Sequence, residues 1–549
     1  MLNVIILAAG DISKKLPFLI SGNCSPSLIP INTKPLIFYL LEFYQAFEDC
    51  RIHVFVSTTQ METVKSEISA FKNNCVLYPL PETRGVNHSL KMAVGMVPFS
   101  EETVVNLVTT IPTVMPELNE VQISKDVTQY KICSNIIPTK NGMSFAPKND
   151  SLKKPGHPFT GIFRVKTADL LNALERTEID NDLLYVVINL YRIIPLQYKK
   201  VDWIDCGHEI NYYETKSKLI SARTFNEITV SLGKGILRKT SHDIDTLRNE
   251  YHYMMSLPGD IRVYFPRVIM DFREERTGKG FFEMEFYGYP NLVEYRLYWK
   301  LDSAHWYRIF NRLQEVLKEF KEHKSSISRD AFKEIYLGKT RRRFLNFYEQ
   351  VTKAGEDTSW LDSEIYVNDV KCQPLDSLWD ILEKKIMSLY NKEDFCIIHG
   401  DFCFTNILYD MPSGILRFVD PRGSFGDGNA TIYGDQKYDL AKLAHSAIGC
   451  YDYFANELFE IEREGYHFHY RLNLRENNEL ITILCMDMIK KLGYHENDIR
   501  FIIGLLFVSM SSLHRESYQR QQALFIHGLR ILNDSLSGLP VKMNEEISR

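Results

Sequence analysis

The stretch FCIIHGDFCFTNILYD, Phe395 to Asp410, decides the fold of the second half of the chain. An apolar strand runs directly into a carboxylate at Asp401, and an amide, Asn406, stands five positions later. The next apolar strand, ILRFVD, ends in a further carboxylate at Asp420. A single Asp after a strand usually caps a turn. Two carboxylates and an amide at this spacing instead predict a loop that performs chemistry.

These side chains meet the needs of phosphoryl transfer, which depends on positioning and charge stabilisation more than on covalent chemistry. Asp401 begins the loop, where its carboxylate can reach an acceptor hydroxyl. Amide and carboxylate oxygens are hard ligands that suit Mg²⁺, so Asn406 and Asp420 are candidate metal ligands. A hairpin between their strands would bring the two together.

A cation for nucleotide phosphates is expected on an earlier strand. Lys239 in ILRKTS is placed for that role, and Glu250, in the helix that follows, is placed to hold it in position. Arg238 and Lys234 are alternatives, because strand alternation does not decide among these three cations.

The segments HGDFCFTNIL, FVDPRG and GDQKYDLAKL resemble the motifs of the aminoglycoside phosphotransferase and choline kinase family, over about residues 225 to 535. The resemblance implies a two-lobed, protein-kinase-like α+β fold and an ATP- and Mg²⁺-dependent kinase for a small-molecule hydroxyl. It makes Asp401 the catalytic base, Asn406 and Asp420 the metal ligands, and Lys239 the phosphate-binding lysine. MEFYGYPNLVEYRL lies where the family's interlobe hinge binds adenine, so Glu285 to Tyr287 are candidate nucleotide-binding residues.

The first half of the chain alternates continuous apolar strands with amphipathic helices, beginning at NVIILAAG. This pattern predicts an α/β fold with a doubly wound, mainly parallel sheet covered on both faces. We expect a first domain over residues 1–222, a second over 223–540 and a tail at 541–549. From Ala304 onward, we expect helices interrupted only by the strands around Asp401 and Asp420.

The segments VIILAAG, SPSLIPINTKPLI, ETRGVNHSLKMAV, FTGIFRVK and WIDCGHEINYYET resemble sugar-nucleotide pyrophosphorylases and related nucleotidyltransferases, over about residues 1 to 218. The resemblance implies a nucleotidyltransferase-like domain, with Asp205 as a metal ligand. Three positions depart from the family: the first loop reads DISKK, with only Lys14 and Lys15 as cations, and Ser27 and Thr109 replace a lysine and an aspartate. These losses predict a degenerate domain that keeps a ligand pocket; a bifunctional enzyme is the alternative.

Several charged groups keep more than one interpretation. Arg422 could contact a phosphate or an acidic acceptor, or it could pair with Asp427 for structural reasons. The basic segment KTRRRFL, 339–345, is either a solvated helix face or a site for an acidic or phosphorylated ligand. His399 is expected to brace its loop through hydrogen bonds. Asp435 and Asp439 are expected to cap a helix and to support the site from outside rather than to act in catalysis.

Composition excludes some classes of partner. The 549 residues carry a net charge of −5, which gives no electrostatic basis for a nucleic-acid or anionic-membrane partner. The cysteines show no metal-ligand spacing, and no run of about 18 apolar residues could span a membrane. We therefore expect a cytoplasmic protein. The pairing of a kinase-like with a nucleotidyltransferase-like domain resembles proteins of bacterial capsule and surface-polysaccharide biosynthesis, and this resemblance implies a multidomain transferase with a small-molecule acceptor and a nucleotide or nucleotide sugar as partners. A regulatory pseudoenzyme is the remaining alternative.

Overall fold

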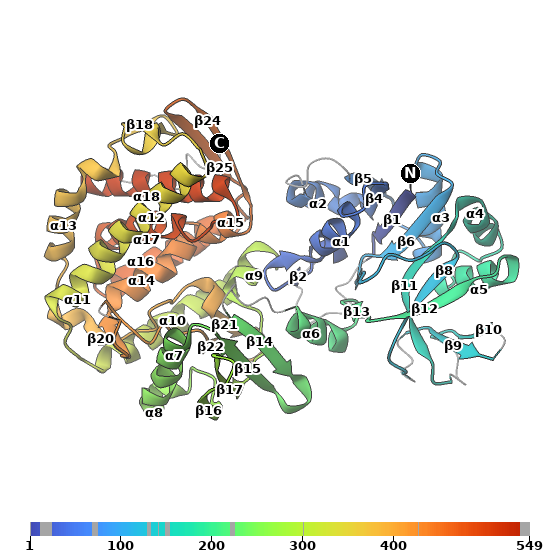
Figure 1. Cartoon of the computed structure of the whole chain (residues 1–549), viewed down its shortest axis with the longest axis horizontal. Coiled ribbons are helices and arrows are strands. Elements are labelled where there is room, and N and C mark those ends of the chain that lie inside the picture. The colour runs from blue at the N-terminus through green and yellow to red at the C-terminus, as the bar shows by residue number, and fades with distance from the viewer. Residues whose placement is uncertain are drawn as a thin grey trace. The chain divides into compact units, whose positions relative to one another are not determined.

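The computed structural model divides the chain into two compact units, Met1–Leu219 and Ile220–Arg549, which are described separately (Figure 1). The structure describes residues 2–10, 25–68, 75–128, 133–140, 142–148, 154–219, 226–299, 301–426 and 428–537. The expected tail, the cations Lys14 and Lys15, and Asp427 lie outside these residues.

The N-terminal unit is built on one sheet whose central strand is β1 (Leu2–Ala8). It pairs in parallel with β4 (Cys50–Ser57) and β6 (Glu102–Leu107), as its continuous apolar sequence predicts. β5 continues the parallel part, while β11 pairs antiparallel with β6, β8 and β9. The remaining strands of the sheet are β5 (Cys75–Leu80), β8 (Glu120–Ser124), β9 (Asn135–Thr139), β10 (Gly142–Ala146), β11 (His157–Lys166) and β12 (Gln197–Val201).

Helices cover both faces of this sheet. Every residue of β1 is buried, and successive side chains of a strand point to opposite faces, so both faces must be covered. One face forms a continuous apolar core with α3 (Val86–Met96), α4 (Thr167–Glu175) and α5 (Leu183–Ile193). α1 (Leu36–Gln45) and α2 (Met61–Ile68) pack against β4. The expected α/β class is confirmed.

The C-terminal unit begins with a small lobe. Its antiparallel sheet has the order β14-β15-β17-β16, and α7 packs against it. The glycine-containing turn between the antiparallel strands β14 and β15 adopts the left-handed conformation at Gly235 (φ 62°), which glycine tolerates without strain. The elements are β14 (Asn226–Ser231), β15 (Ile236–Ser241), α7 (Ile244–Ser256), β16 (Val268–Glu274) and β17 (Gly280–Glu285).

The large lobe is mainly helical and gathers around α17 (Glu496–Ser511), which is buried on nearly all sides. A helix that is apolar around its whole circumference belongs in a core, and α17 accordingly packs against α12, α14 and α18 (Figure 1). The principal helices are α9 (Leu292–Leu297), α10 (Ser303–Glu322), α12 (Lys339–Lys353), α14 (Gln436–Ala447), α16 (Asn478–Lys491) and α18 (Tyr518–Ser537).

One expectation for this lobe is wrong. Besides the strands around Asp401 and Asp420, a separate sheet forms in the order β19-β18-β25-β24. Its strands are β18 (Ile365–Val367), β19 (Val370–Cys372), β24 (Phe459–Glu464) and β25 (His467–Leu472). The signal was present in FEIEREGYHFHYRL, where buried and exposed side chains alternate along β25 and Gly465 turns the hairpin at φ 61°.

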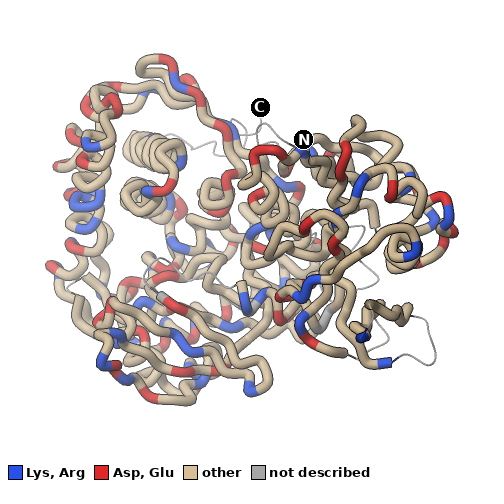
Figure 2. The backbone as a smooth tube through the Cα atoms, turned by 45° about the vertical axis from the view of Figure 1, so that its right-hand side comes forward, with Lys and Arg blue, Asp and Glu red and all other residues tan. Residues whose placement is uncertain are grey.

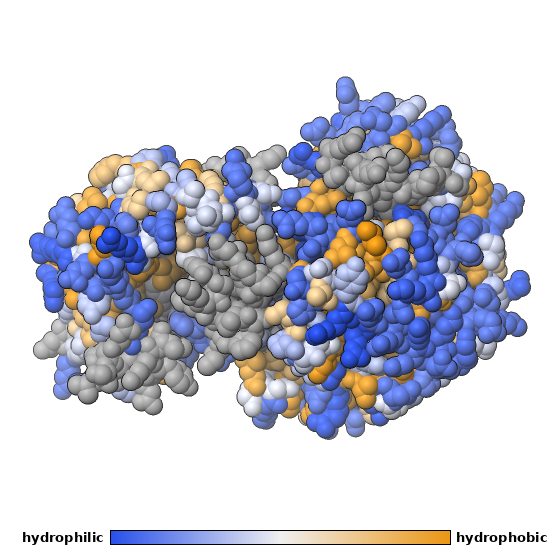
Figure 3. Space-filling model, turned by 180° about the vertical axis from the view of Figure 1, so that it is seen from behind, coloured by the Kyte–Doolittle hydropathy of each residue, from blue (hydrophilic) through white to orange (hydrophobic). Residues whose placement is uncertain are grey.

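Lys and Arg are interspersed with Asp and Glu throughout the drawn chain (Figure 2). The face shown in Figure 3 is mostly hydrophilic, with apolar side chains in scattered patches. Among the described residues, no helix combines the length and the apolar character that crossing a membrane requires.

Candidate functional site

Helix α14 supports the loop that carries Asp401 through hydrogen bonds to the loop's backbone. β20 (Phe395–Ile397) leads into the loop, and the Asp439 carboxylate accepts the backbone N–H groups of His399 (2.6 Å) and Gly400 (2.8 Å). Asp435 caps the N-terminus of α14 by accepting the N–H of Lys437. The two aspartates therefore act as the supports that the sequence indicated.

Asp401 lies between a lysine and an amide. Its Oδ1 forms a 2.7 Å ion pair with Lys442 Nζ, and its Oδ2 accepts a 3.2 Å hydrogen bond from the Asn406 amide. The same amide donates to the Asp401 carbonyl at 2.9 Å, and this hydrogen bond closes the loop between Asp401 and Asn406. Burial lowers the pKa of Lys442, but the Asp401 charge outweighs burial and raises it, so the lysine stays protonated.

The role of Lys442 escaped the sequence analysis. It stands in the quoted segment GDQKYDLAKL, one helical turn after Asp439, and this spacing puts both side chains on the same face of α14. The spacing of Asp439 and Lys442 was the sequence signal that could have indicated this role.

Asp420 reaches the same site through a hairpin. β21 (Ile407–Asp410) pairs antiparallel with β22 (Ile415–Phe418), and the Val419 N–H donates to the Asn406 carbonyl at 3.0 Å. Asp420 follows with φ 58°, an unusual left-handed conformation for a residue other than glycine. The hairpin thus places Asn406 and Asp420 side by side, as expected.

Lys239 completes the arrangement from the small lobe. Its Nζ lies 2.6 Å from Glu250 Oε2 and 2.8 Å from Asp420 Oδ1. Burial lowers the pKa of Lys239, but Asp420 and Glu250 together raise it above its usual value. The two alternative cations lie elsewhere: Arg238 pairs with Glu283 at 2.7 Å, and Lys234 is exposed in the turn.

The donor set fits magnesium better than a transition metal. No cluster of three or more His, Cys, Asp or Glu side chains suited to a metal occurs within the described parts of the chain. Mg²⁺ is usually held by one or two carboxylates together with substrate phosphates. The half-exposed Asp420 carboxylate and the amide oxygen of Asn406 provide such a partial shell.

His399 has a structural role in this geometry. Its Nδ1 accepts the Asp401 N–H at 3.2 Å, which assigns the proton to Nε2, and Nε2 donates to the Val419 carbonyl at 3.0 Å. Burial lowers its pKa to about 4, although the Asp401 charge acts in the opposite direction. The ring is therefore neutral at neutral pH and ties the Asp401 loop to the strand before Asp420.

The predicted hinge lies directly after β17. The Glu285 N–H already donates to the Arg267 carbonyl at 2.9 Å, and the Phe286 N–H donates to Gly235 at 2.9 Å. Among the described residues, the Tyr287 N–H has no backbone acceptor. The Tyr287 hydroxyl donates to the Glu285 carboxylate at 2.8 Å. Tyr287 is therefore better placed than Glu285 to offer a backbone donor to a base.

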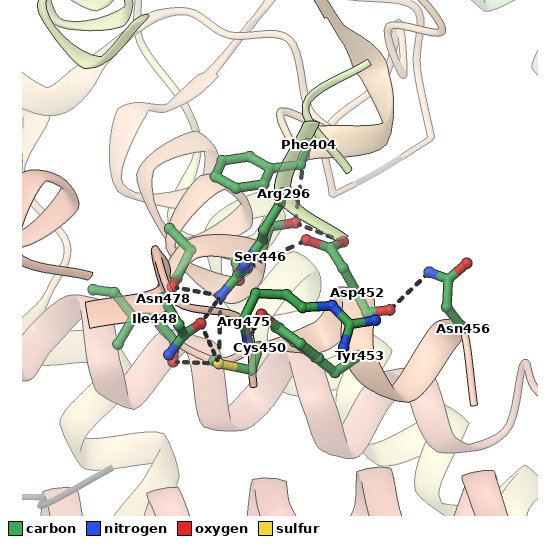
Figure 4. Close-up of polar contacts among 12 residues, drawn as sticks. Arg296, Phe404, Ser446, Ile448, Cys450, Asp452, Tyr453, Asn456, Arg475 and Asn478 are labelled. Carbon is green, nitrogen blue, oxygen red and sulfur yellow. Dashed lines mark hydrogen bonds and ion pairs between the residues drawn. The ribbon is translucent and has the colours of Figure 1, made fainter. Parts of the chain in front are cut away.

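A buried polar cluster at the C-terminal end of α14 also supports the loop (Figure 4). Arg296 on α9 donates to the Ala447 carbonyl at 3.2 Å and to Asn478 Oδ1 at 2.5 Å. Asp452, 3.4 Å from the guanidinium, also accepts from the Ser446 hydroxyl, which in turn accepts the Phe404 N–H at 3.3 Å. The cluster anchors the turn before Asn406. Its members are widely separated in the chain, so no local sequence pattern indicates it.

Asp205 lies in a separate cavity of about 500 Å³ in the N-terminal unit. Thr109, Thr160, Asp182 and Trp203 also line this cavity. Both Asp205 oxygens are engaged, by the Gly207 N–H (2.9 Å), His208 (2.6 Å) and Asn211 (2.7 Å). Thr109, not a second carboxylate, is the neighbour at the position where the resemblance expects one.

Residues 218–472 match the model of the phosphotransferase enzyme family. The match confirms the resemblance expected for the C-terminal unit and supports a kinase-type enzyme. No curated protein matches the chain.

Solved structures similar to the N-terminal part of the chain have low TM-scores and low sequence identities. A protein assigned as a glucose-1-phosphate thymidylyltransferase from Bacillus anthracis is 14% identical, covers 41% of this chain and 97% of its own, and gives a TM-score of 0.35. An inositol-1-phosphate CTP transferase from T. maritima is 14% identical, covers 40% of this chain and 98% of its own, and gives a TM-score of 0.32. Likenesses of this strength carry no conclusion about function.

Proposed function

We propose that the C-terminal unit transfers a phosphoryl group from ATP to a hydroxyl of a small molecule. The observation that carries this proposal is a chain of direct contacts that connects Lys239, Asp401, Asn406 and Asp420, although these residues come from separate segments. A cation, a carboxylate near the loop and a pair of hard oxygen ligands are the parts that phosphoryl transfer needs.

Each side chain has a defined role in the proposal. Asp401 orients the acceptor hydroxyl and accepts its proton, while Lys442 fixes the position of the carboxylate. Lys239 binds nucleotide phosphates and is held by Glu250. The backbone at Tyr287, with Glu285 beside it, receives the adenine. Asn406 and Asp420 hold Mg²⁺, which neutralises phosphate charge when bound.

The experiment is a screen for ADP release. The full-length protein is supplied with Mg·ATP and single sugars, amino alcohols or hydroxy acids, and ADP is measured against a no-acceptor blank. Acceptor-dependent ADP release that disappears in Asp401→Asn supports the proposal. Release that is the same in the variant contradicts it.

For the N-terminal unit we propose a nucleotidyltransferase-like domain that keeps a ligand pocket without efficient transfer. The support is the cavity around Asp205 together with Thr109 and Ser27 at the departing positions. We place the protein in the cytoplasm, in bacterial capsule or surface-polysaccharide biosynthesis, and we set the domain boundary at 222/223. A bifunctional kinase and nucleotidyltransferase is the second candidate, because a cavity large enough for a ligand is present around Asp205.

A further inference from the structure

The ion pair with Asp401 uses only part of the hydrogen-bonding capacity of Lys442. An ammonium carries three N–H donors, and one of them is directed at Asp401 Oδ1, 2.7 Å away. Within the parts of the chain that the structure describes, Lys442 forms no other hydrogen bond or ion pair. Unmet donors on a buried charge are costly, so the two remaining donors are open to an anionic ligand.

A rigid helix holds this ammonium in place. Every residue of α14 is buried, and Asp439, one turn before Lys442, accepts two backbone N–H groups of the Asp401 loop. The side chains of Lys442 and Asp401 are 11% and 19% exposed, so the pair is deep but not sealed from a ligand. A cation held this firmly is preorganised for negative charge that develops beside it.

A transferring phosphoryl group would lie within reach of Lys442. A hydroxyl bonded to Asp401 Oδ1 lies about 2.7 Å from that oxygen, and therefore at most about 5.4 Å from Lys442 Nζ. The γ-phosphorus of ATP must approach the same hydroxyl in line for transfer. Apart from the carboxylate itself, the oxygens of the γ-phosphoryl group are therefore the anions of the reaction that come nearest to Lys442.

The other lysine of the site has less capacity left. Lys239 Nζ already binds two carboxylates, Glu250 at 2.6 Å and Asp420 at 2.8 Å, whereas Lys442 binds one. Negative charge in phosphoryl transfer is spread over three equatorial oxygens, and more than one cation is needed to stabilise it. Lys442 is the lysine with two donors to spare beside the proposed base.

We infer that Lys442 donates to an oxygen of the γ-phosphoryl group of ATP as well as to Asp401. It is thus a second phosphate-binding cation, supplied by the large lobe in addition to Lys239 of the small lobe. The inference deepens the proposed kinase function and rests on it.

The transfer step shows why one lysine serves both groups. The acceptor oxygen forms a bond to the γ-phosphorus, the bond from that phosphorus to the β,γ-bridging oxygen breaks, and ADP leaves with the electron pair. The acceptor proton passes to Asp401, which thereby loses its charge. A buried ammonium without an anion is costly, and the negative phosphoryl oxygens supply the anion at that moment. Lys442 therefore stabilises the transition state more than the resting site.

The first test compares two nucleotides and needs no acceptor. The full-length protein is titrated by calorimetry with ADP and with the non-hydrolysable analogue AMP-PNP, each with saturating Mg²⁺. Of the two, only AMP-PNP carries a γ-phosphoryl group. We expect Lys442→Met to weaken AMP-PNP binding about tenfold or more, through loss of a charge-assisted hydrogen bond, and to leave ADP binding unchanged. The matched control is Lys385→Met, because Lys385 pairs with Asp498 at 2.7 Å rather than with the Asp401 loop.

The affinity for ADP reports whether the nucleotide site of a variant is intact. Lys442→Gln is the second variant, because its neutral amide can still donate to Asp401 but brings no charge to the phosphate. It should also weaken AMP-PNP binding selectively, and it decides if Lys442→Met does not fold. An unchanged ratio of the two affinities in the folded variants overturns the inference alone. Failure of both nucleotides to bind the wild type contradicts the kinase proposal, and the inference with it.

The second test separates a contact with phosphate from a role that acts only through Asp401. Single-turnover transfer, with an acceptor found in the ADP screen, is measured for Asp401→Asn, Lys442→Met and the double variant. We expect Lys442→Met to slow transfer about tenfold or more even in the Asp401→Asn protein, because the phosphate contact does not need the carboxylate. A lysine that only positions Asp401 would have no effect, or would speed transfer, once Asp401 is replaced. That result overturns the inference and leaves the kinase proposal intact.

Discussion

Lys239 Nζ lies 2.8 Å from Asp420 Oδ1, although 181 residues separate them in the chain. The contact joins the small-lobe sheet to the end of the β21–β22 hairpin. The lysine is buried, whereas half of the Asp420 side chain is exposed. One carboxylate therefore faces both the cation that is proposed to bind phosphate and the solvent from which Mg²⁺ would arrive.

Asp420→Ala should raise the Mg²⁺ concentration needed for half-maximal turnover by about tenfold or more, because it removes a direct carboxylate ligand from a site with few others. A magnesium titration at fixed ATP measures this. Asp410→Ala is the matched control, since Asp410 ends the neighbouring strand of the same hairpin and bonds Ser413. An unchanged magnesium requirement in Asp420→Ala excludes this residue as a ligand.

The C-terminal unit should fold and bind ATP alone. A fragment that starts at Arg223 retains all of the small-lobe sheet and the core around α17. Soluble protein with a cooperative thermal transition that rises with Mg·ATP is the expected result. Persistent aggregation of the fragment would show that the boundary at 222/223 is misplaced.

The N-terminal unit should release little or no pyrophosphate from CTP, UTP, dTTP or GTP, even with the phosphorylated product of the kinase present. Thr109 stands where a metal carboxylate is expected, and the Asp205 oxygens are already engaged by three donors. Loss of a metal ligand and a phosphate cation removes transition-state stabilisation, and each ~1.4 kcal/mol is about tenfold in rate. A coupled assay for pyrophosphate measures this activity. Rapid pyrophosphate release with any one nucleotide establishes the bifunctional alternative.

His399 predicts a specific dependence of stability on pH. Burial lowers its pKa from 6.5 to about 4 in the folded state. The unfolded chain thus binds the proton first, so the stability from the neutral ring is complete above pH 6.5 and is lost as the pH falls through about 4. The wild-type free energy of unfolding should fall, relative to His399→Gln, by up to about 1.4 kcal/mol per pH unit within this window. The free energies of unfolding are measured by denaturant titration at each pH. If they change with pH in the same way for the wild type and for His399→Gln, the lowered pKa of His399 is wrong.

The sequence predicted the parts of the site that follow short-range rules. Asp401, Asn406 and Asp420 lie at fixed offsets from apolar strands, and the hairpin that joins them needs only local pairing. The choice of Lys239 over Arg238 could not be made from alternation. It depends on Glu250 and Asp420 reaching the inner side of the sheet, which is a tertiary contact.

Other features depend on long-range packing. The Arg296 cluster brings α9 together with the segment 446–478, and no local pattern marks such a meeting. The basic segment 339–345 was visible as charge, but only the tertiary structure shows that its first residue, Lys339, is buried rather than part of a solvated face. The sheet of β18, β19, β24 and β25 was a missed pattern, because its alternation could have been recognised.

The most direct test of the central claim is single-turnover phosphoryl transfer by Asp401→Asn with an acceptor identified in the ADP screen. Nucleotide affinity and unfolding temperature are measured on the same preparation, because the variant also removes the ion pair with Lys442. We expect transfer slowed about 10²- to 10⁴-fold with nearly unchanged nucleotide affinity, since the carboxylate acts on the acceptor hydroxyl. Transfer at a near-wild-type rate by folded Asp401→Asn would contradict the account.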